Sequence, residues 1–317
     1  MKTSKFLNKK AIMVILSQTQ PGFTRKINFD NNRLYYQVET LIFGEALKRA
    51  LNPERIIIGC KNSKSKVNKL FINYLKKFGC PIIKMRYESA ELAKISINIL
   101  LASSITTTNV LARACEKVSA DWHEIIPALK LDKRIGKNAY IKPGLGISGG
   151  NIERDIYSVG EILKKENKTL SIIKAFQKNS LYMKSWVYRV LKKEKILSKK
   201  NKFNIGILGL SYKEKTNSIK NSPAIHLLKK IRNTKVKVYD PAVILKKIKN
   251  CQQADNIRSL VNNSNVIILM TPWFEFRNIK NILRAQKSRK IILIDPYRII
   301  DFEKIKNKYF KYFTIGK

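Results

Sequence analysis

The stretch that decides the fold is Pro143–Asp155, which reads PGLGISGGNIERD. Four glycines fall within seven residues behind the proline, namely Gly144, Gly146, Gly149 and Gly150. Such a run favours neither helix nor strand, and it predicts a loop whose backbone N–H groups approach another group closely. Apolar residues recur at helical spacing over Ile152–Lys165, and Asn151 stands where a helix cap is favoured. The stretch therefore predicts a glycine loop leading into a helix N-terminus that attracts anions, or otherwise a plain glycine turn.

Composition indicates a folded protein with a strongly basic surface. The chain has 317 residues, 44% of them apolar, which is enough for two domains and a sizeable core. Its formal charge of +42 arises from 64 Lys and Arg against 22 Asp and Glu. These basic residues are spread along the whole chain. We therefore interpret them as solvated surface that adheres to nucleic acid only non-specifically and in a salt-sensitive way.

Cysteine and histidine usage predicts a reducing compartment and no metal site. No CxxC spacing links the four cysteines, and buried free thiols are predicted at Cys60, Cys80, Cys115 and Cys251. Only two histidines occur, far apart, which argues against a histidine-rich metal site. The apolar run Ala11–Leu16 is too short for a signal segment, and no stretch approaches 18 consecutive apolar residues. We expect a cytoplasmic protein without a membrane span.

The first part of the chain predicts part of a Rossmann sheet. Short apolar runs predict buried strands at Ala11–Leu16, Ile56–Gly59 and Pro81–Met85. An amphipathic helix is predicted over Val67–Phe78, which gives α/β layers. No strand–GxGxxG–helix unit precedes Ala11. We therefore expect only a remnant of a dinucleotide-binding sheet in residues 1–86.

A long helix is predicted from Tyr87 to about Val118. It contains neither proline nor glycine, and helices of this length commonly join two domains or form a dimer seam. Glu91, Lys94 and Asn98 share one face at spacings of three and four residues. This triplet either orients a substrate hydroxyl and a water or forms an ordinary helical ion pair.

Further helices are predicted after this one. They span Ala120–Leu131, interrupted near Pro127, and Lys168–Lys195. Together with the long helix they give a central helical dimerisation region over residues 87–200. The polar segment Ser198–Lys202 marks the boundary to the last domain.

The last part of the chain, residues 201–317, predicts a second doubly wound sheet. Apolar strands are predicted at Asn204–Leu210, Lys235–Tyr239, Ser264–Met270 and Ile291–Ile294, with a helix over Ile219–Arg232. The predicted fold is therefore α/β throughout: a partial Rossmann sheet, a central region of long helices and a carboxy-terminal Rossmann-like parallel sheet. Ligands of such sheets bind at the carboxyl ends of the strands.

An ordered series of short motifs gives the chain a family resemblance. Along the sequence these are Arg134-Ile135-Gly136, the glycine loop ending in Asp155, Gly209–Lys213, Ser222-Pro223, Tyr239-Asp240-Pro241 and Asp295–Arg298. From about Met13 to its end the chain resembles the UDP-glucose/GDP-mannose dehydrogenase family. That family oxidises C6 of a nucleotide sugar twice with NAD, from alcohol through a thiohemiacetal to acid. The resemblance implies a cofactor-binding Rossmann domain, a helical dimerisation region and a nucleotide-binding last domain.

The resemblance also implies roles for individual residues. Glu39 matches a carboxylate that acts as a base, and Lys94 and Asn98 match residues that stabilise oxyanions and bind the catalytic water. Asp155 matches the carboxylate paired with that water. Asn151 stands at the position of the family's nucleophilic cysteine, and an amide forms no thiohemiacetal.

Further matches fall on the substrate and cofactor sides. Arg134 matches an arginine that reaches the sugar nucleotide across a dimer, and Lys213 and Arg298 match contacts to the nucleotide sugar. Lys220 stands where an arginine usually touches the cofactor. The loop glycines implied on the substrate side are Gly144 and Gly146.

The function predicted in this way is NAD-dependent oxidation of a UDP-glucose-type sugar at its C6 hydroxyl. Because the first glycine turn of the NAD-binding domain has no counterpart, we expect an incomplete enzyme or one piece of a split enzyme, which carries the substrate side of the site and lacks most of the NAD side. A separate amino-terminal Rossmann fragment is then a possible partner, besides a second copy of the chain. One alternative is a non-catalytic nucleotide-sugar-binding or dimerisation protein. Another is a polyanion-binding protein driven by the charge of +42.

Overall fold

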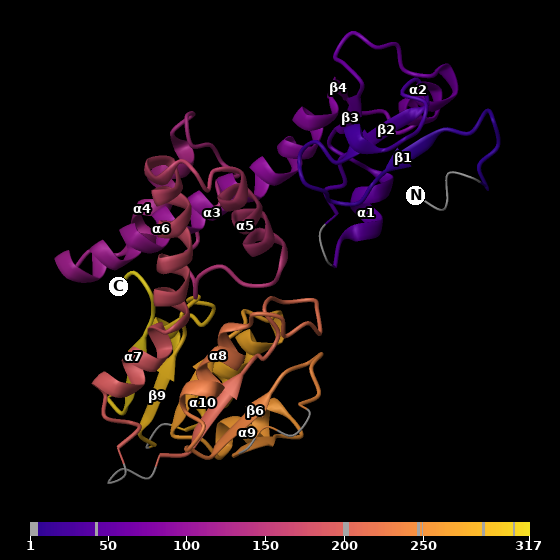
Figure 1. Ribbon diagram of the computed structural model, residues 1–317. Helices are drawn as coiled ribbons and strands as arrows, with labels where there is room; N and C mark the ends of the chain where they lie inside the picture. Colours follow the sequence, from indigo (N-terminus) through magenta and orange to yellow (C-terminus); the bar gives the residue numbers. More distant parts are fainter. Residues whose placement is uncertain are drawn as a thin grey trace. The chain divides into compact units, whose positions relative to one another are not determined.

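The computed structural model divides the chain into two compact units. It describes residues 6–41, 44–198, 203–245, 248, 250–286, 289–306 and 308–317. Unit 1 comprises Met1–Leu100 and unit 2 comprises Leu101–Lys317. Helix α3, which spans Tyr87–Val118, runs from the first unit into the second (Figure 1).

Unit 1 is built on a four-stranded sheet in the order β1-β2-β3-β4. Its strands are β1 (Met13–Ile15), β2 (Leu34–Gln37), β3 (Ile56–Cys60) and β4 (Ile82–Arg86), and its helices besides α3 are η2 (Thr24–Lys26), α1 (Ala46–Leu51) and α2 (Lys69–Lys76). The three predicted strands are confirmed. The sequence prediction missed β2, which pairs parallel with β1 and antiparallel with β3. Unit 1 is therefore a mixed sheet rather than a purely parallel one.

The core of unit 1 lies on both faces of this sheet because side chains alternate along each strand. Leu34 and Tyr36 pack with Tyr87 of α3 on one face. Tyr35 of the same strand packs on the other face, against Phe71 of α2, with ring centroids 4.9 Å apart. A strand buried on both faces shows no apolar–polar alternation, so β2 carries little strand signal in its sequence.

Helix α3 has 32 residues and the bounds that the sequence predicts. By length and composition alone, it is the one helix of the described part of the chain that could cross a membrane, which is weak evidence for a membrane span. The criterion of 18 consecutive apolar residues did not single it out, because Ser, Thr and Asn interrupt its apolar residues. Tyr87 and Ala90 belong to the core of unit 1, and Ala112 and Cys115 to the core of unit 2.

The helices that follow depart from the predicted ones in three places. They are α4 (Trp122–Leu131), α5 (Asn151–Ile162), α6 (Asn167–Lys184) and α7 (Trp186–Lys193). Helix α4 continues through Pro127 rather than breaking there. The single helix predicted over Lys168–Lys195 is two helices that break at Ser185. Asn151 is the first helical residue of α5, and the N-cap is Gly150, so the predicted side-chain cap is wrong.

The second sheet is parallel and has the order β10-β9-β8-β5-β6-β7. Its strands are β5 (Ile205–Leu208), β6 (Val236–Tyr239), β7 (Cys251–Gln253), β8 (Val266–Leu269), β9 (Ile291–Ile294) and β10 (Phe310–Phe313). Between them lie α8 (Pro223–Lys230), α9 (Ile257–Asn262), η3 (Phe274–Asn278), α10 (Ile279–Arg284) and η4 (Phe302–Lys304). From β7 the order reads third, second, first, fourth, fifth, sixth, which is that of a dinucleotide-binding sheet. The predicted doubly wound sheet is confirmed.

The two faces of this sheet are covered by different helices. Val236 and Val238 of β6 face α7 and α8 and belong to one core cluster. Leu208 and Ile267 belong to a second cluster with residues of α9 and α10. The outermost strands β7 and β10 were not predicted, because two of the three residues in CQQ are polar and the four residues of FKYF are too few for a clear pattern.

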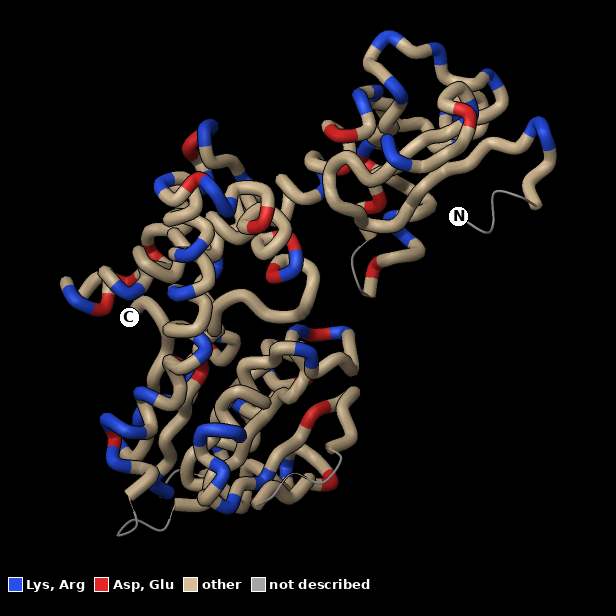
Figure 2. The backbone as a smooth tube through the Cα atoms, in the orientation of Figure 1, with Lys and Arg blue, Asp and Glu red and all other residues tan. Residues whose placement is uncertain are grey.

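Lysines and arginines are distributed over both units rather than gathered on one of them (Figure 2). This distribution agrees with their even spread along the sequence. The division into domains at residues 86 and 200 stays a prediction. Its second boundary falls at residues 199–202, which lie outside the described residues.

Candidate functional site

The glycine loop of unit 2 lies against residues that follow the carboxyl end of β5. A Cβ atom on Gly149 would come within 2.7 Å of the Tyr212 ring, and one on Gly150 within 2.8 Å of Cε of Lys220. Gly149 also has a φ of +80°, which disfavours other residues. The loop therefore needs glycine at position 149, whereas the flexible end of the Lys220 side chain could move to admit a Cβ at position 150. It lies at the sheet edge where ligands of such folds bind.

The beginning of the loop is held by α3 and by the segment after β9. The backbone N–H of Gly144 donates to Oδ1 of Asn109, 2.9 Å away, and a Cβ on Gly144 would lie 3.2 Å from the Tyr297 ring. Tyr297 in turn donates its hydroxyl to the carbonyl of Met270 at 3.2 Å. Asn109 is buried, and its Nδ2 has no hydrogen-bond partner among the described residues. Sequence reasoning missed Asn109, since a lone polar residue inside a long helix carries no motif.

Gly146 fixes the middle of the loop on helix α6. Its φ is +80°, and a Cβ there would come within 2.5 Å of the Ser180 carbonyl oxygen. The Ser180 hydroxyl accepts a hydrogen bond from the backbone N–H of Ile147 at 2.9 Å. The predicted loop is therefore a rigid, docked segment rather than a free turn.

A buried lysine ties the loop to helix α5. The ammonium of Lys184 on α6 lies 3.0 Å from Oε1 of Glu153 and donates to Oδ1 of Asn221 at 2.6 Å. Asn221 donates from Nδ2 to the carbonyl of Gly149 at 3.4 Å. The Lys184 side chain is only 2% exposed, so the ion pair offsets the cost of burying its charge. No sequence pattern distinguishes Lys184 from the other lysines of its helix.

Helix α5 carries two predicted catalytic residues on one face. Asn151, at the first position of the helix, is exposed, and Asp155 lies four residues later with a fully buried side chain. Arg154 approaches Asp155, with 3.4 Å between Nε and Oδ1. Asn151 thus lies directly after the glycine loop with an exposed side chain, and its catalytic role stays a prediction.

The predicted nucleotide contacts of unit 2 have defined surroundings. The Lys213 ammonium lies 5.9 Å from the centre of the Tyr212 ring, and burial raises the pKa of the Tyr212 hydroxyl. Arg298 has a φ of +52° and donates from Nη1 to Oδ1 of Asp121 at 2.5 Å. The same Asp121 oxygen accepts from the N–H of His123 and so caps helix α4. Arg298 is therefore held in place by a helix cap.

Arg134 is a strongly exposed predicted site residue of unit 2. Its side chain is 89% exposed and forms two hydrogen bonds with Asp132, at 3.0 and 2.6 Å. These bonds raise the pKa of the guanidinium. Among the described residues the side chain of Arg134 thus pairs with Asp132, and its role across a dimer stays a prediction.

Two motif aspartates organise the backbone at the carboxyl edge of the second sheet. Oδ2 of Asp240 accepts from the N–H groups of Leu210 and Ser211 at 2.7 and 3.0 Å, and Oδ1 accepts from Ala242 and Val243. Burial raises the pKa of Asp295 to about 6, although hydrogen bonds from backbone N–H groups oppose the shift. Both carboxylates therefore serve the turns that form this edge.

In unit 1, Glu91 has a different role from the one that its pattern suggested. Its fully buried carboxylate accepts hydrogen bonds from the N–H and hydroxyl of Thr24 at 2.8 and 2.7 Å and from the N–H of Gly22 at 2.5 Å. Glu91 therefore anchors the loop after β1 and does not face a substrate. Lys94 and Asn98 are half-buried on the same helix.

Glu39 lies two residues after β2 and is also half-buried. Its Oε1 accepts a hydrogen bond from the side-chain amide of Gln37 at 3.2 Å. Glu39, Lys94 and Asn98 thus all belong to unit 1, whereas Asn151 and Asp155 belong to unit 2. Their catalytic roles stay predictions.

The described residues do not form the phosphate-binding turn of a dinucleotide site. In unit 1 the turn after β1 contains one glycine, Gly22, whose N–H is used by Glu91. Residues 144–149 do read G-x-G-x-x-G, but no strand precedes them, as that motif requires. In the same part of the chain, no group of three His, Cys, Asp or Glu side chains is arranged to hold a metal ion.

A doubly wound parallel sheet with a glycine loop and lysines at its carboxyl edge defines a nucleotide-binding α/β protein. Comparison with known protein families then identifies the family to which this chain belongs. The chain belongs to the UDP-glucose/GDP-mannose dehydrogenase family. The family's central-domain model matches residues 88–180, and its UDP-binding-domain model matches residues 206–302.

Individual relatives agree with this assignment. The chain is 29% identical to a UDP-glucose 6-dehydrogenase of Rickettsia bellii, over 99% of this chain and 75% of the relative. It is 25% identical to the UDP-glucose 6-dehydrogenase TuaD of Bacillus subtilis, over 88% of this chain and 61% of the relative. The chain thus spans about three quarters of the length of the Rickettsia enzyme.

Solved structures show the same fold. A UDP-glucose dehydrogenase from Pyrobaculum islandicum superposes with a TM-score of 0.80 at 21% identity, covering 96% of this chain and 70% of that one. A UDP-D-ManNAc dehydrogenase from Pyrococcus horikoshii superposes with a TM-score of 0.79 at 22% identity, covering 99% and 74%. The predicted resemblance and the α/β fold are therefore confirmed.

Proposed function

We propose that the chain is a nucleotide-sugar 6-dehydrogenase homologue that binds a UDP-glucose-type sugar nucleotide and serves the oxidation of its C6 hydroxyl. The observation that carries this proposal is the docking of the glycine loop at the carboxyl edge of the second sheet, against Tyr212 and Lys220. Family membership supports the same conclusion, because the matched models include a UDP-binding domain. In solution we expect a homodimer formed through α3.

The proposal assigns the diphosphate to the positive side chains of unit 2. Lys213 and Arg298 are the proposed contacts to the nucleotide sugar, and Gly144 and Gly146 are the loop positions that let the substrate come close. Arg298 suits this role because its bond to Asp121 fixes the guanidinium before a ligand arrives. Arg134 is proposed to act on the sugar nucleotide of a second copy.

In the proposed chemistry, Glu39 acts as the base that accepts the proton of the C6 hydroxyl. Lys94 and Asn98 stabilise the developing oxyanion and a water, and Asp155 takes part in the same water chemistry. Asn151 offers an amide where a covalent route needs a thiolate, so this chain's own residues serve one oxidation, from alcohol to aldehyde.

NAD, which the family implies, supplies the hydride acceptor when it is bound. The described residues form no glycine turn for its pyrophosphate after β1. We therefore assign Lys220 to the cofactor side and infer that this chain alone holds NAD weakly. A separate Rossmann fragment is the proposed partner that completes the cofactor site.

Binding of the sugar nucleotide is the first test, since it needs no cofactor. Purified chain at moderate salt is titrated calorimetrically with UDP-glucose, with NAD and a short RNA as comparison ligands. We expect UDP-glucose to bind and the affinity to fall about ten-fold or more in Lys213→Ala and Arg298→Ala. Lys168→Ala, an exposed lysine of α6, is the matched control with unchanged affinity. RNA binding without any UDP-glucose binding would refute the proposal and leave the polyanion hypothesis.

Turnover separates the enzyme from a non-catalytic binder. In the presence of NAD and, where required, the completing fragment, we expect UDP-glucose to be consumed with an aldehyde as product. Asn151→Cys is expected to shift the product towards the acid, measured by mass spectrometry. Binding without turnover under all these conditions would favour the non-catalytic alternative. A cytoplasmic location is proposed for the same protein, in agreement with its four free cysteines.

A further inference from the structure

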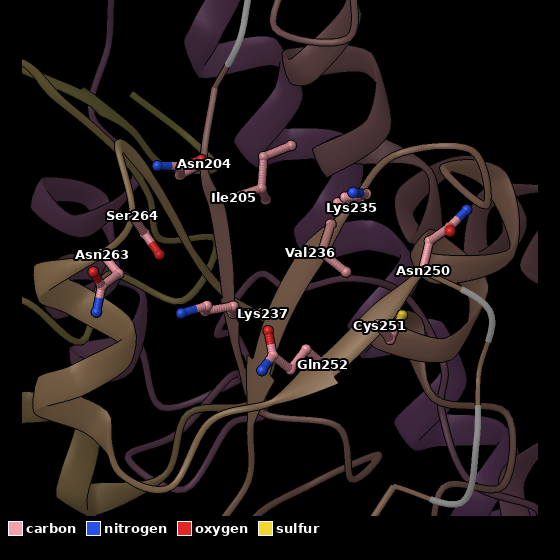
Figure 3. A pocket seen from close by; sticks show the side chains of 10 residues that line it. All are labelled: Asn204, Ile205, Lys235, Val236, Lys237, Asn250, Cys251, Gln252, Asn263 and Ser264. Carbon is pink, nitrogen blue, oxygen red and sulfur yellow. The ribbon is translucent and has the colours of Figure 1, made fainter.

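A separate pocket lies at the opposite, amino-terminal edge of the second sheet. Its volume is about 470 Å³, which is within the range of small-ligand sites. It is lined by residues around the starts of β5, β6, β7 and β8, namely Asn204, Ile205, Lys235, Val236, Lys237, Asn250, Cys251, Gln252, Asn263 and Ser264 (Figure 3). None of these residues belongs to the motifs that identify the family.

Strand register places the polar lining residues on one face of the sheet. Lys237 of β6 is aligned with Gly206 of β5 and with Gln252 of β7. Lys235 lies two residues before Lys237 and therefore shares its face. Val236 points to the other face, where it packs in the core beneath α7 and α8. The alternation in β6 thus places Lys235 and Lys237 on the face opposite this core.

This surface remains open because α9 covers only part of the face. Helix α9 has six residues, Ile257–Asn262, and Leu260 packs over Gly206, where a Cβ would come within 2.4 Å of its Cδ2. Lys237 extends from β6 across β5 towards Asn263 and Ser264 (Figure 3). The side chain of Lys237 is half-buried over a position that has no side chain of its own.

The charge of the pocket is positive and uncompensated. In the described part of the chain, neither Lys235 nor Lys237 has an ion-pair partner, and no carboxylate lines the pocket. The side-chain amides of Asn204 and Gln252 are exposed at the rim of the pocket. An anion bound here would form a charge-assisted hydrogen bond with the half-buried ammonium group of Lys237. The exposed amides can donate hydrogen bonds to phosphate oxygens and exchange them with hydroxyl groups.

We propose that this pocket binds a small phosphorylated metabolite, such as a sugar phosphate, at a site distinct from the glycine loop. The ammonium group of Lys237 meets the phosphate, exposed Lys235 adds positive charge at the rim of the pocket, and the amides of Asn204 and Gln252 donate to and accept from the hydroxyl groups of the sugar. The site lies at the opposite end of the strands from the proposed nucleotide-sugar contacts. It therefore shares no lining residue with the proposed nucleotide-sugar contacts.

The test is calorimetric titration of the full chain with glucose 6-phosphate, with glucose, inorganic phosphate and a ten-nucleotide RNA as comparison ligands. We expect glucose 6-phosphate to bind more tightly than glucose or phosphate alone. The double variant Lys235→Gln/Lys237→Gln is expected to lose affinity about ten-fold or more. Circular dichroism checks that each variant is folded.

A matched control separates a specific pocket from general charge. Lys168→Gln/Lys178→Gln removes the same two charges from exposed positions on α6 and is expected to change affinity less than about two-fold. Lys235→Arg/Lys237→Arg keeps the charges and is expected to retain binding. Equal losses in the pocket and control variants would overturn the proposal. So would the absence of binding at millimolar glucose 6-phosphate, or binding of RNA alone.

Discussion

Replacing Glu91 tests whether its carboxylate anchors the loop after β1. Its two oxygens accept from the N–H and hydroxyl of Thr24 and from the N–H of Gly22, all within 2.8 Å, and from the Thr19 hydroxyl at 3.3 Å. Glutamine keeps the shape but presents an NH₂ group to one of these donors. Each hydrogen bond to a charged acceptor contributes about 1.5–3 kcal/mol. We therefore expect Glu91→Gln to weaken the docking of the loop by about 2–4 kcal/mol.

Limited proteolysis measures this effect in unit 1. All three tryptophans of the chain belong to unit 2, so their fluorescence does not report on the loop. Trypsin cleaves after Arg25 and Lys26, which lie in η2 beside the anchored residues. We expect cleavage there to accelerate about 30-fold or more in Glu91→Gln, as identified by mass spectrometry.

The matched control is an ion pair on the same helix and the same loop. Glu88 pairs with Arg25, with 2.8 Å between Nε and Oε1, but both side chains are more than one third exposed. Glu88→Gln is expected to cost less than about 1 kcal/mol. Equal cleavage rates in wild type and Glu91→Gln would refute the anchoring role. Glu91 would then again be a candidate for substrate binding or catalysis.

Three further predictions concern unit 2. Gly146→Ala is expected to destabilise this unit by about 2–4 kcal/mol, measured by denaturation with tryptophan fluorescence, because its φ is +80° and a Cβ would meet the Ser180 carbonyl. Burial raises the pKa of Asp295 from 3.8 to about 6, which favours its protonated form in the folded state. The contribution of this carboxyl group to the free energy of unfolding is therefore fully present below pH 3.8 and is lost as the pH rises through 6. The unfolding free energy of the wild type minus that of Asp295→Asn should therefore fall as the pH is raised from 3.8 to about 6. Glu153→Gln is expected to cost about 1–3 kcal/mol in the same assay, because it removes the negative partner of buried Lys184.

The sequence predicts the elements of this fold best where their pattern is long or strongly apolar. The bounds of α3 agree with the prediction because its 32 residues contain neither proline nor glycine. Strand β2 was missed because it is buried on both faces, and β7 because two of its three residues are polar. The apolar residues keep helical spacing across Ser185, so the sequence gives no sign of the break there. The structure shows that α6 ends and α7 begins at this residue.

The candidate site was predicted in part. The glycine loop was recognised because four glycines in a short run are a local signal. Its supports on α3 and α6 were not, because Asn109, Ser180 and Lys184 are single polar residues far away in sequence. Asn151 was taken for a helix cap, since the preceding glycine, which takes that position, has no side chain to signal it.

Many residues of the motifs that reveal the family stabilise backbone turns of the fold. Asp240 accepts hydrogen bonds from four backbone N–H groups, and Ser222 accepts from the N–H of Ala224 at the start of α8. Gly209 has a φ of +97° and leaves no room for a Cβ beside Thr271. These residues form the turns at the carboxyl edge whether or not a ligand binds there. The proposed activity therefore rests on the side chains that such turns leave available, among them Asn151, which the resemblance predicts to stand at the position of the family's cysteine.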